Sequence, residues 1–165
     1  MKTLALVAVL LAVATSARAA DSCDGTFAVG GSSVKLTSAY VTIDPLFSKP
    51  GQEYLRVVLS DVPVPAAAAA DDFALQKLTR DKKLHAVVLI ISPDKQVKST
   101  QLYDAGFDMD SVSSAGTNNR FDPNVGGVNN KNRIRGKAYT KEPREFRSVR
   151  YEYTVTFDAS IHRAP

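Results

Sequence analysis

Apolar and polar residues alternate along much of this chain, most clearly near its C-terminal end. Positions 149, 151, 153, 155 and 157 are apolar or aromatic, and the positions between them are polar or charged. A period of two, with one apolar and one polar face, is typical of strands in antiparallel sheets. The pattern therefore predicts a mainly antiparallel β protein.

Shorter stretches with the same character recur upstream, separated by residues that favour turns. Residues 30–33 (Gly-Gly-Ser-Ser) and 93–95 (Pro-Asp-Lys) each predict a hairpin connection. Gly136, inside a strand-like stretch, indicates a bulge or a close backbone approach. The expected strands span residues 26–29, 34–43, 53–59, 86–92, 96–103, 111–116, 133–140 and 149–158.

One alanine-rich segment breaks the strand pattern. Residues 66–80 begin with five consecutive alanines and continue with spaced apolar residues, which predicts one helix. Asp71 offers an alternative start, as the N-cap of a shorter helix that begins at Asp72. Residues 84–91 are apolar on both faces of a strand, so we expect the helix to cover the second face.

These elements fit one domain, residues 21–165, whose length suits a single hydrophobic core. We predict an antiparallel β-sandwich of about seven to nine strands with one short helix packed on it. A closed β-barrel is the alternative, and its interior could hold a small apolar ligand. The helical insertion near residues 66–80 interrupts the regular strand spacing of a barrel, which favours the sandwich.

The first twenty residues have the composition of a secretory signal peptide. Lys2 precedes an apolar core at residues 4–13, and Ala-Arg-Ala at residues 17–19 is a cleavage signal. We therefore predict that residues 1–20 are a signal peptide and that the protein is exported to the periplasm or the medium of a bacterium. This apolar run is too short to span a membrane and later runs are shorter, so we do not expect an integral membrane protein.

The charge balance gives little support for a nucleic-acid partner. The formal net charge is +4, but Lys2 and Arg18 belong to the predicted signal, so the mature chain carries about +2. Nucleic-acid modules usually combine a strongly basic domain with several stacking aromatic residues. We therefore expect no nucleic-acid partner.

Cys23 is the single cysteine, so the chain cannot form an internal disulfide. Its place near the start of the predicted mature chain favours a free thiol in a frayed terminus. An intermolecular disulfide through Cys23 is the alternative in an oxidising compartment.

Residues suited to catalysis are sparse. The two histidines are His85 and His162, and nothing in the sequence around His85 orients it as a general base. Asp104, Asp108 and Asp110 lie close together, but they match a calcium loop poorly and are better interpreted as a polar connection. Phosphate loops, zinc-ligand spacings and nucleophile elbows are absent from the sequence, so we predict no catalytic residue, metal or cofactor.

Basic residues cluster between positions 131 and 150. Arg133, Arg135 and Lys137 fall on one face of a predicted strand, and Tyr139 extends that row. This row is the candidate binding stripe; the simpler interpretation is a solvated outer face whose charges discourage edge pairing. The polar stretch at residues 117–132 is the longest expected loop, and long loops in compact domains are often functional.

Several short stretches resemble an uncharacterised family of small bacterial secreted β proteins. They are residues 25–27 (Gly-Thr-Phe), 34–37 (Val-Lys-Leu-Thr), 83–85 (Lys-Leu-His), 136–139 (Gly-Lys-Ala-Tyr), 151–153 (Tyr-Glu-Tyr) and 157–159 (Phe-Asp-Ala). The resemblance implies export and a β fold. It implies no activity, cofactor or site residue.

These observations predict an exported, non-catalytic β protein that binds a partner protein or an envelope component. A carrier of a small apolar ligand, held in a barrel pocket, is the alternative. A hydrolase with His85 as its general base is the third hypothesis, because candidate acids, bases and nucleophiles are not clustered in the sequence.

Overall fold

The computed structural model describes residues 21–114 and 116–163, and the predicted signal peptide at residues 1–20 lies outside them. The described residues form ten strands of one mainly antiparallel sheet, two short helices and one 3-10 helix. The strands are β1 (Ser22–Val29), β2 (Ser32–Ile43), β3 (Leu55–Ser60), β4 (Ala86–Ile91), β5 (Val97–Tyr103), β6 (Val112–Ser114), β7 (Asn119–Asp122), β8 (Arg133–Thr140), β9 (Arg144–Phe146) and β10 (Val149–His162). The helices are α1 (Ala66–Ala69), α2 (Asp72–Arg80) and the 3-10 helix η1 (Ala105–Phe107).

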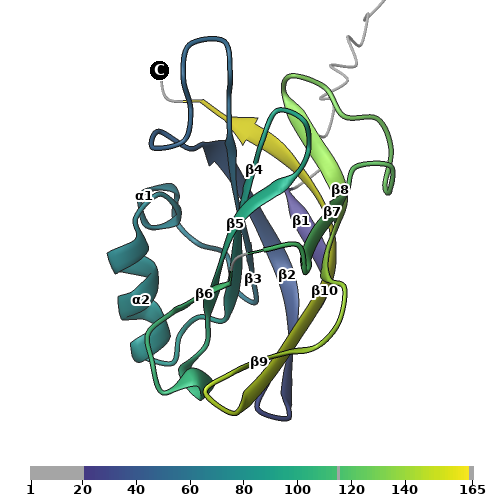
Figure 1. The fold of residues 1–165 in the computed structure, drawn as a ribbon. Coiled ribbons are helices and arrows are strands. Elements are labelled where there is room, and N and C mark those ends of the chain that lie inside the picture. The colour runs from purple at the N-terminus through teal and green to yellow at the C-terminus, as the bar shows by residue number, and fades with distance from the viewer. Residues whose placement is uncertain (1–20, 115, 164–165) are drawn as a thin grey trace, which may run out of the picture.

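The sheet curls until its two ends nearly meet, which gives an incompletely closed barrel (Figure 1). The strand order is β6-β5-β4-β3-β2-β1-β10-β8-β7, and β9 pairs with β10 beside this path. Apart from a short parallel contact between the end of β10 and β2, the pairs are antiparallel. The predicted antiparallel class with a helix is confirmed, and the barrel alternative describes the curled sheet better than the sandwich.

The β1–β2 hairpin shows how local sequence sets a turn. Gly30 and Gly31 have φ angles of +58° and +87°. Glycine adopts such angles without steric cost, and two-residue turns of this kind match the twist of the paired strands. Ser32 and Ser33 already belong to β2, so the connection is two residues shorter than the predicted stretch at 30–33.

Strand β10 organises the sheet, because it pairs with β1 along one edge and with β8 and β9 along the other. Its end also holds the start of the described chain: the Ser160 N–H donates to the Asp21 carboxylate at 2.7 Å, and His162 Nε2 lies 3.1 Å from the same carboxylate. The His162 ring stacks on Tyr40 with the ring centroids 4.7 Å apart. The frayed terminus expected around Cys23 is therefore wrong, since Cys23 lies in a paired strand, and His162 is paired as well.

Aromatic and aliphatic side chains from most strands fill the barrel interior. Phe27, Tyr153 and Phe157 are at most 2 % exposed. The Phe121 ring stacks on Phe157 and lies directly over Gly136, where an added Cβ would be 2.2 Å from the ring. The Asp122 backbone carbonyl would lie 2.6 Å from the same Cβ, so the close backbone approach predicted as one of two alternatives for Gly136 is confirmed.

A smaller core lies outside the barrel, between strands β3 to β5 and the helices. Leu75 of α2 packs among Val58 and Val88, which point outward from the sheet. The Asp71 carboxylate caps α2 by accepting a backbone N–H at 2.8 Å, so the shorter expected helix forms from Asp72, and the alanines before it form the separate helix α1. Both helices lie along one side of the barrel (Figure 1), and the predicted cover of the two-faced apolar strand is confirmed.

Arg56 provides a polar anchor beneath the helices. Its buried guanidinium donates to the Ala69 carbonyl at 2.8 Å and to the Asp72 carboxylate at 2.5 Å. The Tyr103 hydroxyl donates to the same Asp72 oxygen at 2.7 Å. Burial, reinforced by this carboxylate, raises the pKa of Tyr103, so its hydroxyl stays protonated and remains a donor.

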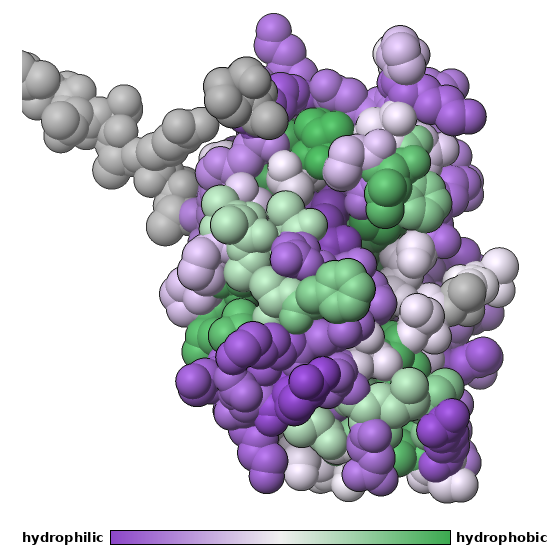
Figure 2. Space-filling view, turned by 90° about the vertical axis from the view of Figure 1, so that its left-hand side faces the viewer, coloured by the Kyte–Doolittle hydropathy of each residue, from purple (hydrophilic) through white to green (hydrophobic). Residues whose placement is uncertain are grey.

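Figure 2 views the molecule from the side that carries the helices, and it shows apolar areas interrupted by hydrophilic ones. Leu46, Phe47 and Phe73 are the large exposed apolar residues in the β2–β3 connection and on α2. Scattered exposure of this kind is ordinary for soluble domains. None of the helices in the described residues has the length and hydrophobicity that a membrane crossing requires.

Two strands are missing from the sequence prediction. β7 lies inside the stretch expected to be a loop at residues 117–132, and β9 lies in a polar stretch after β8. Strands of three or four residues contain too few alternations to stand out from a loop. The loop prediction is therefore wrong over Asn119–Asp122, and β7 forms one end of the sheet.

Candidate functional site

The two ends of the sheet, β5 with β6 on one side and β7 on the other, approach each other without pairing as strands. β6 pairs with β5 only at residues 100–102, so residues 97–99 of β5 have no strand partner on that side in the described structure. Among the residues that the structure describes, β7 pairs with β8 alone. The chain passes from β6 to β7 across this gap, which we call the seam.

A buried hydrogen-bond network holds one end of the seam together. The Asn119 carboxamide donates to both the carbonyl and the hydroxyl oxygen of Ser114 at 3.1 Å. Its oxygen accepts from the Tyr153 hydroxyl at 3.0 Å, while Tyr151 Oη lies 2.8 Å from Ser114 Oγ. Burial raises the pKa of Tyr153, which keeps its hydroxyl protonated. This network, the seam latch, joins β6 to β7 and β10 through side chains.

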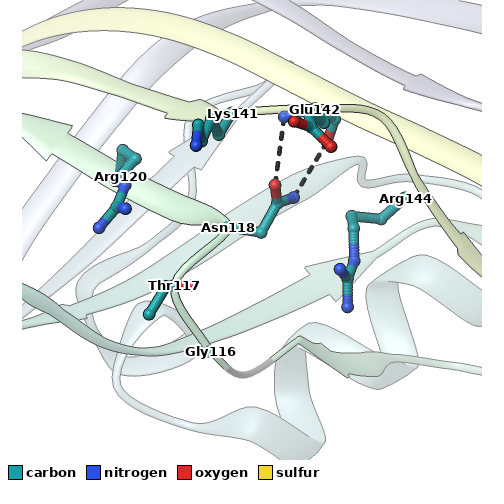
Figure 3. Close-up of a pocket in the computed structure, with 7 residues that line it drawn as sticks. All are labelled: Gly116, Thr117, Asn118, Arg120, Lys141, Glu142 and Arg144. Atoms are coloured by element: carbon teal, nitrogen blue, oxygen red, sulfur yellow. Dashed lines mark hydrogen bonds between the residues drawn. The ribbon is translucent and has the colours of Figure 1, made fainter.

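A pocket of about 390 Å³ opens beside the seam latch (Figure 3). Asn118 fixes its wall, because its carboxamide bonds to the backbone N–H and C=O of Glu142 at 3.1 and 3.0 Å. The Lys141 N–H donates to the Asn118 carbonyl at 2.8 Å. In Figure 3 the side chains of Arg120 and Arg144 lie on either side of Asn118. The hydrogen bonds of Asn118 therefore fix the chain segment between these two cations.

A second pocket, of about 420 Å³, adjoins the first and shares Gly116, Thr117 and Arg120 with it. Its other wall is the beginning of β5 and the turn before it, including Lys95 and Lys98. The two pockets therefore adjoin along the seam, with Arg120 in the lining of both.

Positive charge dominates these two pockets. We call their five basic residues the cationic seam: Lys95, Lys98, Arg120, Lys141 and Arg144. None of them lies within 4 Å of a carboxylate among the described residues, and Glu142 is the single acid in either lining.

Asp94, in the turn next to the cationic seam, balances part of this charge. Its pKa is lowered, first by the hydrogen bond from Ser92 and also by the field of Lys98. The remaining excess of cations on a polar, open surface attracts anions by long-range electrostatics.

The predicted stripe does share one outer strand face, but much of its charge is neutralised. Arg133 Nε and Arg135 Nε lie 2.5 and 2.9 Å from the same Asp158 oxygen. The Lys137 ammonium lies 5.4 Å from the centroid of the Tyr139 ring. An anion would have to compete with Asp158 for the two arginines, so the binding hypothesis for this stripe, which stays a prediction, rests mainly on Lys137 and Tyr139.

The stripe and the cationic seam are neighbours. Arg120 of β7 pairs directly with Tyr139 of β8, and Asp122 pairs with Lys137. Side chains of directly opposed residues in an antiparallel pair lie side by side. Tyr139 therefore connects the predicted stripe to the seam, at Arg120.

Sequence reasoning located only part of this site. Arg120 lies in the stretch that was expected to bind, and Lys141 and Arg144 lie in the basic cluster. Lys95 and Lys98 gave no signal, because they come from a hairpin that only barrel closure brings to the same place. Strand order is the missing information.

His85 is better oriented than the sequence suggested. Its Nδ1 lies 2.8 Å from Asp104 Oδ2, and its backbone N–H donates to Asp61 at 2.8 Å. Among the described residues, no hydroxyl or thiol is within hydrogen-bond distance of its ring. The pair therefore lacks a nucleophile, and Asp104 also caps η1 by accepting the Gly106 N–H at 2.7 Å.

The clustered aspartates do not converge on a common point. Asp104 holds His85, Asp110 forms an ion pair with Arg80, and Asp108 ends η1 in a left-handed conformation. Within the described residues, no group of three or more acidic, histidine or cysteine side chains is arranged to hold a metal ion.

Cys23 faces the barrel interior and is 8 % exposed. Its thiol donates to the Ser38 carbonyl at 3.2 Å, and burial raises its pKa to about 12. A thiol that is buried and protonated reacts slowly. An intermolecular disulfide, which stays untested, would require β1 to open from its neighbours.

Fold and site together define a class: an incompletely closed antiparallel β-barrel with one helical cover and a cationic seam. Comparison with protein-family models, with curated proteins and with solved structures finds no match for this chain. The resemblance to small secreted bacterial proteins therefore stays a prediction, and the function has to be argued from the site alone.

Proposed function

We propose that this protein is an exported, non-catalytic binding protein that takes an anionic partner at the cationic seam. The observation that carries the proposal is the charge of the two adjoining pockets, whose linings contain five basic side chains and one carboxylate. The partner is a protein segment or an envelope component with repeated carboxylate, phosphate or sulfate groups. Export rests on the signal-like sequence of residues 1–20.

The combined length of the two pockets favours an extended partner. Their linings run from the β4–β5 turn at Lys95, past Arg120, to Arg144 at the start of β9. Exposed cations spread along a groove bind a chain of charges better than a single small anion, because each surface ion pair alone contributes only about 0.2–1 kcal/mol.

The described structure does not favour an apolar-ligand carrier. Such a carrier needs a hollow, apolar interior. Here Phe27, Tyr153 and Phe157 fill the barrel, and the two seam pockets are lined mainly by polar and charged side chains. A hydrolase is not favoured either, since His85 has a carboxylate partner but no adjacent nucleophile among the described residues.

Fluorescence anisotropy with labelled polyglutamate and labelled polygalacturonate tests the proposal, because both probes carry repeated carboxylates on different backbones. We expect binding that weakens steeply between about 20 and 200 mM salt. Replacing Arg120, Lys141 and Arg144 together by glutamate removes three ion pairs and adds repulsion, so affinity should fall by about tenfold or more.

A control of equal charge reverses three exposed lysines away from the seam: Lys49, Lys77 and Lys83, of which the last two pair with Asp81. This variant has the same net charge as the seam variant, so it separates a local site from a general charge effect. It should bind both probes nearly as well as the unmodified protein. Equal losses in the two variants, or no binding by the unmodified protein at low salt, would overturn the proposal.

A further inference from the structure

Tyr139 of β8 lies among basic side chains on the outer face of the sheet. It is directly opposite Arg120 of β7 on one side and Thr154 of β10 on the other. Lys137 precedes it by two positions on the same face, and the Lys137 ammonium lies 5.4 Å from the centroid of the Tyr139 ring. Directly opposed side chains lie side by side, so the ring has a basic side chain on two sides and a hydroxyl on a third.

Neither hydrophobic core uses this ring. Tyr139 is half-buried and belongs to neither of the two core clusters. Among the described residues its hydroxyl forms no hydrogen bond, whereas the Tyr151 and Tyr153 hydroxyls are bonded in the seam latch. The ring and the hydroxyl of Tyr139 are therefore available to a partner.

The cations beside Tyr139 form no ion pairs. Within the described residues, no carboxylate oxygen lies within 4 Å of the basic nitrogens of Arg120 or Lys137. Asp122 is directly opposite Lys137, but its carboxylate accepts the Asn124 N–H at 2.9 Å rather than a bond from the lysine. Positive charge therefore remains beside the ring, chiefly at Arg120, and attracts an anion to that side.

Hydroxyl side chains continue the row beyond Tyr139. Thr154 is directly opposite Thr26 of β1, and both threonines are exposed. The row from Thr26 to Arg120 thus crosses four neighbouring strands, β1, β10, β8 and β7, and we call it the Tyr139 row. Because neighbouring strands lie about 4.8 Å apart, the row is about 14 Å long. It presents two hydroxyls, an aromatic ring and a guanidinium in succession.

We propose that the Tyr139 row is a subsite for an acidic polysaccharide built from hexuronic acid units. One sugar ring stacks its C–H face on Tyr139, its carboxylate pairs with Arg120, and its hydroxyls bond to Thr154. A hexuronic acid unit carries an apolar ring face, a carboxylate and hydroxyls, which complement the three kinds of group in the row. This inference rests on the proposed function and names its partner class.

Two other polyanions fit the Tyr139 row less well. A glutamate-rich protein segment supplies carboxylates, but on flexible side chains without a flat ring face. A nucleic acid can stack a base on Tyr139, but such surfaces usually use several aromatic side chains, and Tyr139 is the single aromatic residue of the row. Both polyanions serve as probes in the test.

Four labelled oligomers of equal length test the proposal by anisotropy at about 20 mM salt. Oligogalacturonate is the hexuronic acid probe, and its methyl ester keeps the sugar rings without the charge. Oligoglutamate supplies carboxylates alone, and oligothymidylate supplies phosphates with bases. Oligogalacturonate should bind about tenfold or more tightly than the other three, because only it combines a sugar ring face with a carboxylate beside it.

Substitutions at Tyr139 test the role of the ring. Tyr139→Thr removes the ring but keeps a residue that favours strands, so oligogalacturonate affinity should fall about tenfold while oligoglutamate affinity stays unchanged. Tyr139→Phe keeps the ring and should retain binding. Phe73→Ala removes an exposed ring on α2 and should change neither affinity. Urea unfolding of each variant shows whether its fold is intact.

Tyr139→Trp reports contact with the ring directly, because the chain contains no tryptophan of its own. Oligogalacturonate should shift the emission of this variant to shorter wavelength, since the sugar displaces water from the indole. Oligoglutamate should leave the emission unchanged. Phe73→Trp on α2 is the matched control, and its emission should respond to neither probe.

The outcomes separate the two proposals. A preference for oligogalacturonate that is lost in Tyr139→Thr and retained in Tyr139→Phe supports the hexuronic acid subsite. Equal affinity for oligogalacturonate and oligoglutamate, unaffected by Tyr139→Thr, overturns the subsite and leaves the proposed function standing. Equal or tighter binding of the methyl ester or of oligothymidylate also overturns the subsite. Absence of binding by every probe overturns both proposals.

Discussion

The helix-covered side and the seam differ in what covers the sheet: helices pack over one side, whereas the seam is held by polar hydrogen bonds. On the helix side, Leu75 covers the outward side chains of β3 and β4, and buried Arg56 bonds to α1 and α2. At the seam no element among the described residues covers the gap, and a four-residue polar latch holds one end of it. Side chains that pack over an apolar surface make it inaccessible to partners, whereas a few polar hydrogen bonds leave strand edges and charged side chains accessible.

The difference indicates where stability and binding reside. Apolar burial is the main source of folding free energy, so the helix side should determine how stable the barrel is. Uncompensated surface cations contribute little to stability, so the effect of the cationic seam should be on the proposed binding of an anion. Substitutions on the helix side should therefore change mainly stability, and substitutions at the seam should change mainly binding.

The largest effect is expected from Leu75→Ala on the helix side. Leu75 is fully buried, and truncating such a leucine costs about 2–5 kcal/mol of unfolding free energy. Urea denaturation measures the loss, and polyglutamate affinity should stay unchanged. A loss below about 1 kcal/mol would show that α2 does not seal this side.

A smaller effect is expected from Asn119→Ala in the seam latch. The change removes the carboxamide that accepts from the Tyr153 hydroxyl and donates to Ser114, although Ser114 Oγ keeps its contact with Tyr151. Loss of these buried hydrogen bonds costs about 1–3 kcal/mol. Asn118→Ala is the matched control, because its bonds to Glu142 are exposed and water can replace them. Equal losses of unfolding free energy in the two variants would mean that the buried seam latch contributes no more to stability than the exposed bonds of Asn118 do.

The tie between Asp21 and β10 predicts a pH dependence of stability. Burial disfavours the ionised carboxylate, but hydrogen bonds from Ser160 and His162 outweigh it and hold the pKa of Asp21 below 3.8. The contribution of Asp21 is therefore complete above 3.8 and is lost as the pH falls through the lowered pKa. Asp21→Asn should cost about 1 kcal/mol at neutral pH and less in acid. A deficit that is constant with pH would contradict this account.

The smallest effect on stability is expected from charge reversal in the cationic seam. Arg120, Lys141 and Arg144 are exposed and form no ion pair among the described residues, so each change to glutamate should alter unfolding free energy by at most about 0.5 kcal/mol. Thermal or urea unfolding measures this. A large loss would assign these cations to the fold and remove the argument for a partner.

Local patterns were enough to predict the elements whose signals are local. Alternation predicted the antiparallel class, Asp71 offered the correct helix start, and the apolar strand at residues 84–91 required its helical cover. The sandwich expectation was less accurate, because closure depends on how far the sheet curls, and no single strand encodes that.

The candidate site depends on register and strand order, which local patterns do not contain. The pairing of Asp158 with Arg135 in the β8–β10 register is what neutralises much of the predicted stripe. The approach of β5 to β7 brings Lys98 and Arg120 to one pocket, although they lie in different hairpins. Both facts follow from contacts between distant segments, so only the folded chain reveals them.

Residue-resolved hydrogen exchange, with and without polyglutamate, tests the central claim most directly. The account predicts that amides at residues 97–99 and 119–121 exchange faster than those of β3 and β4 in the free protein, and that polyglutamate slows exchange mainly at the seam. Seam amides already as protected as those of β4, or protection that appears on the helix side instead, would contradict the claim that this barrel is open, cationic and receptive at the seam.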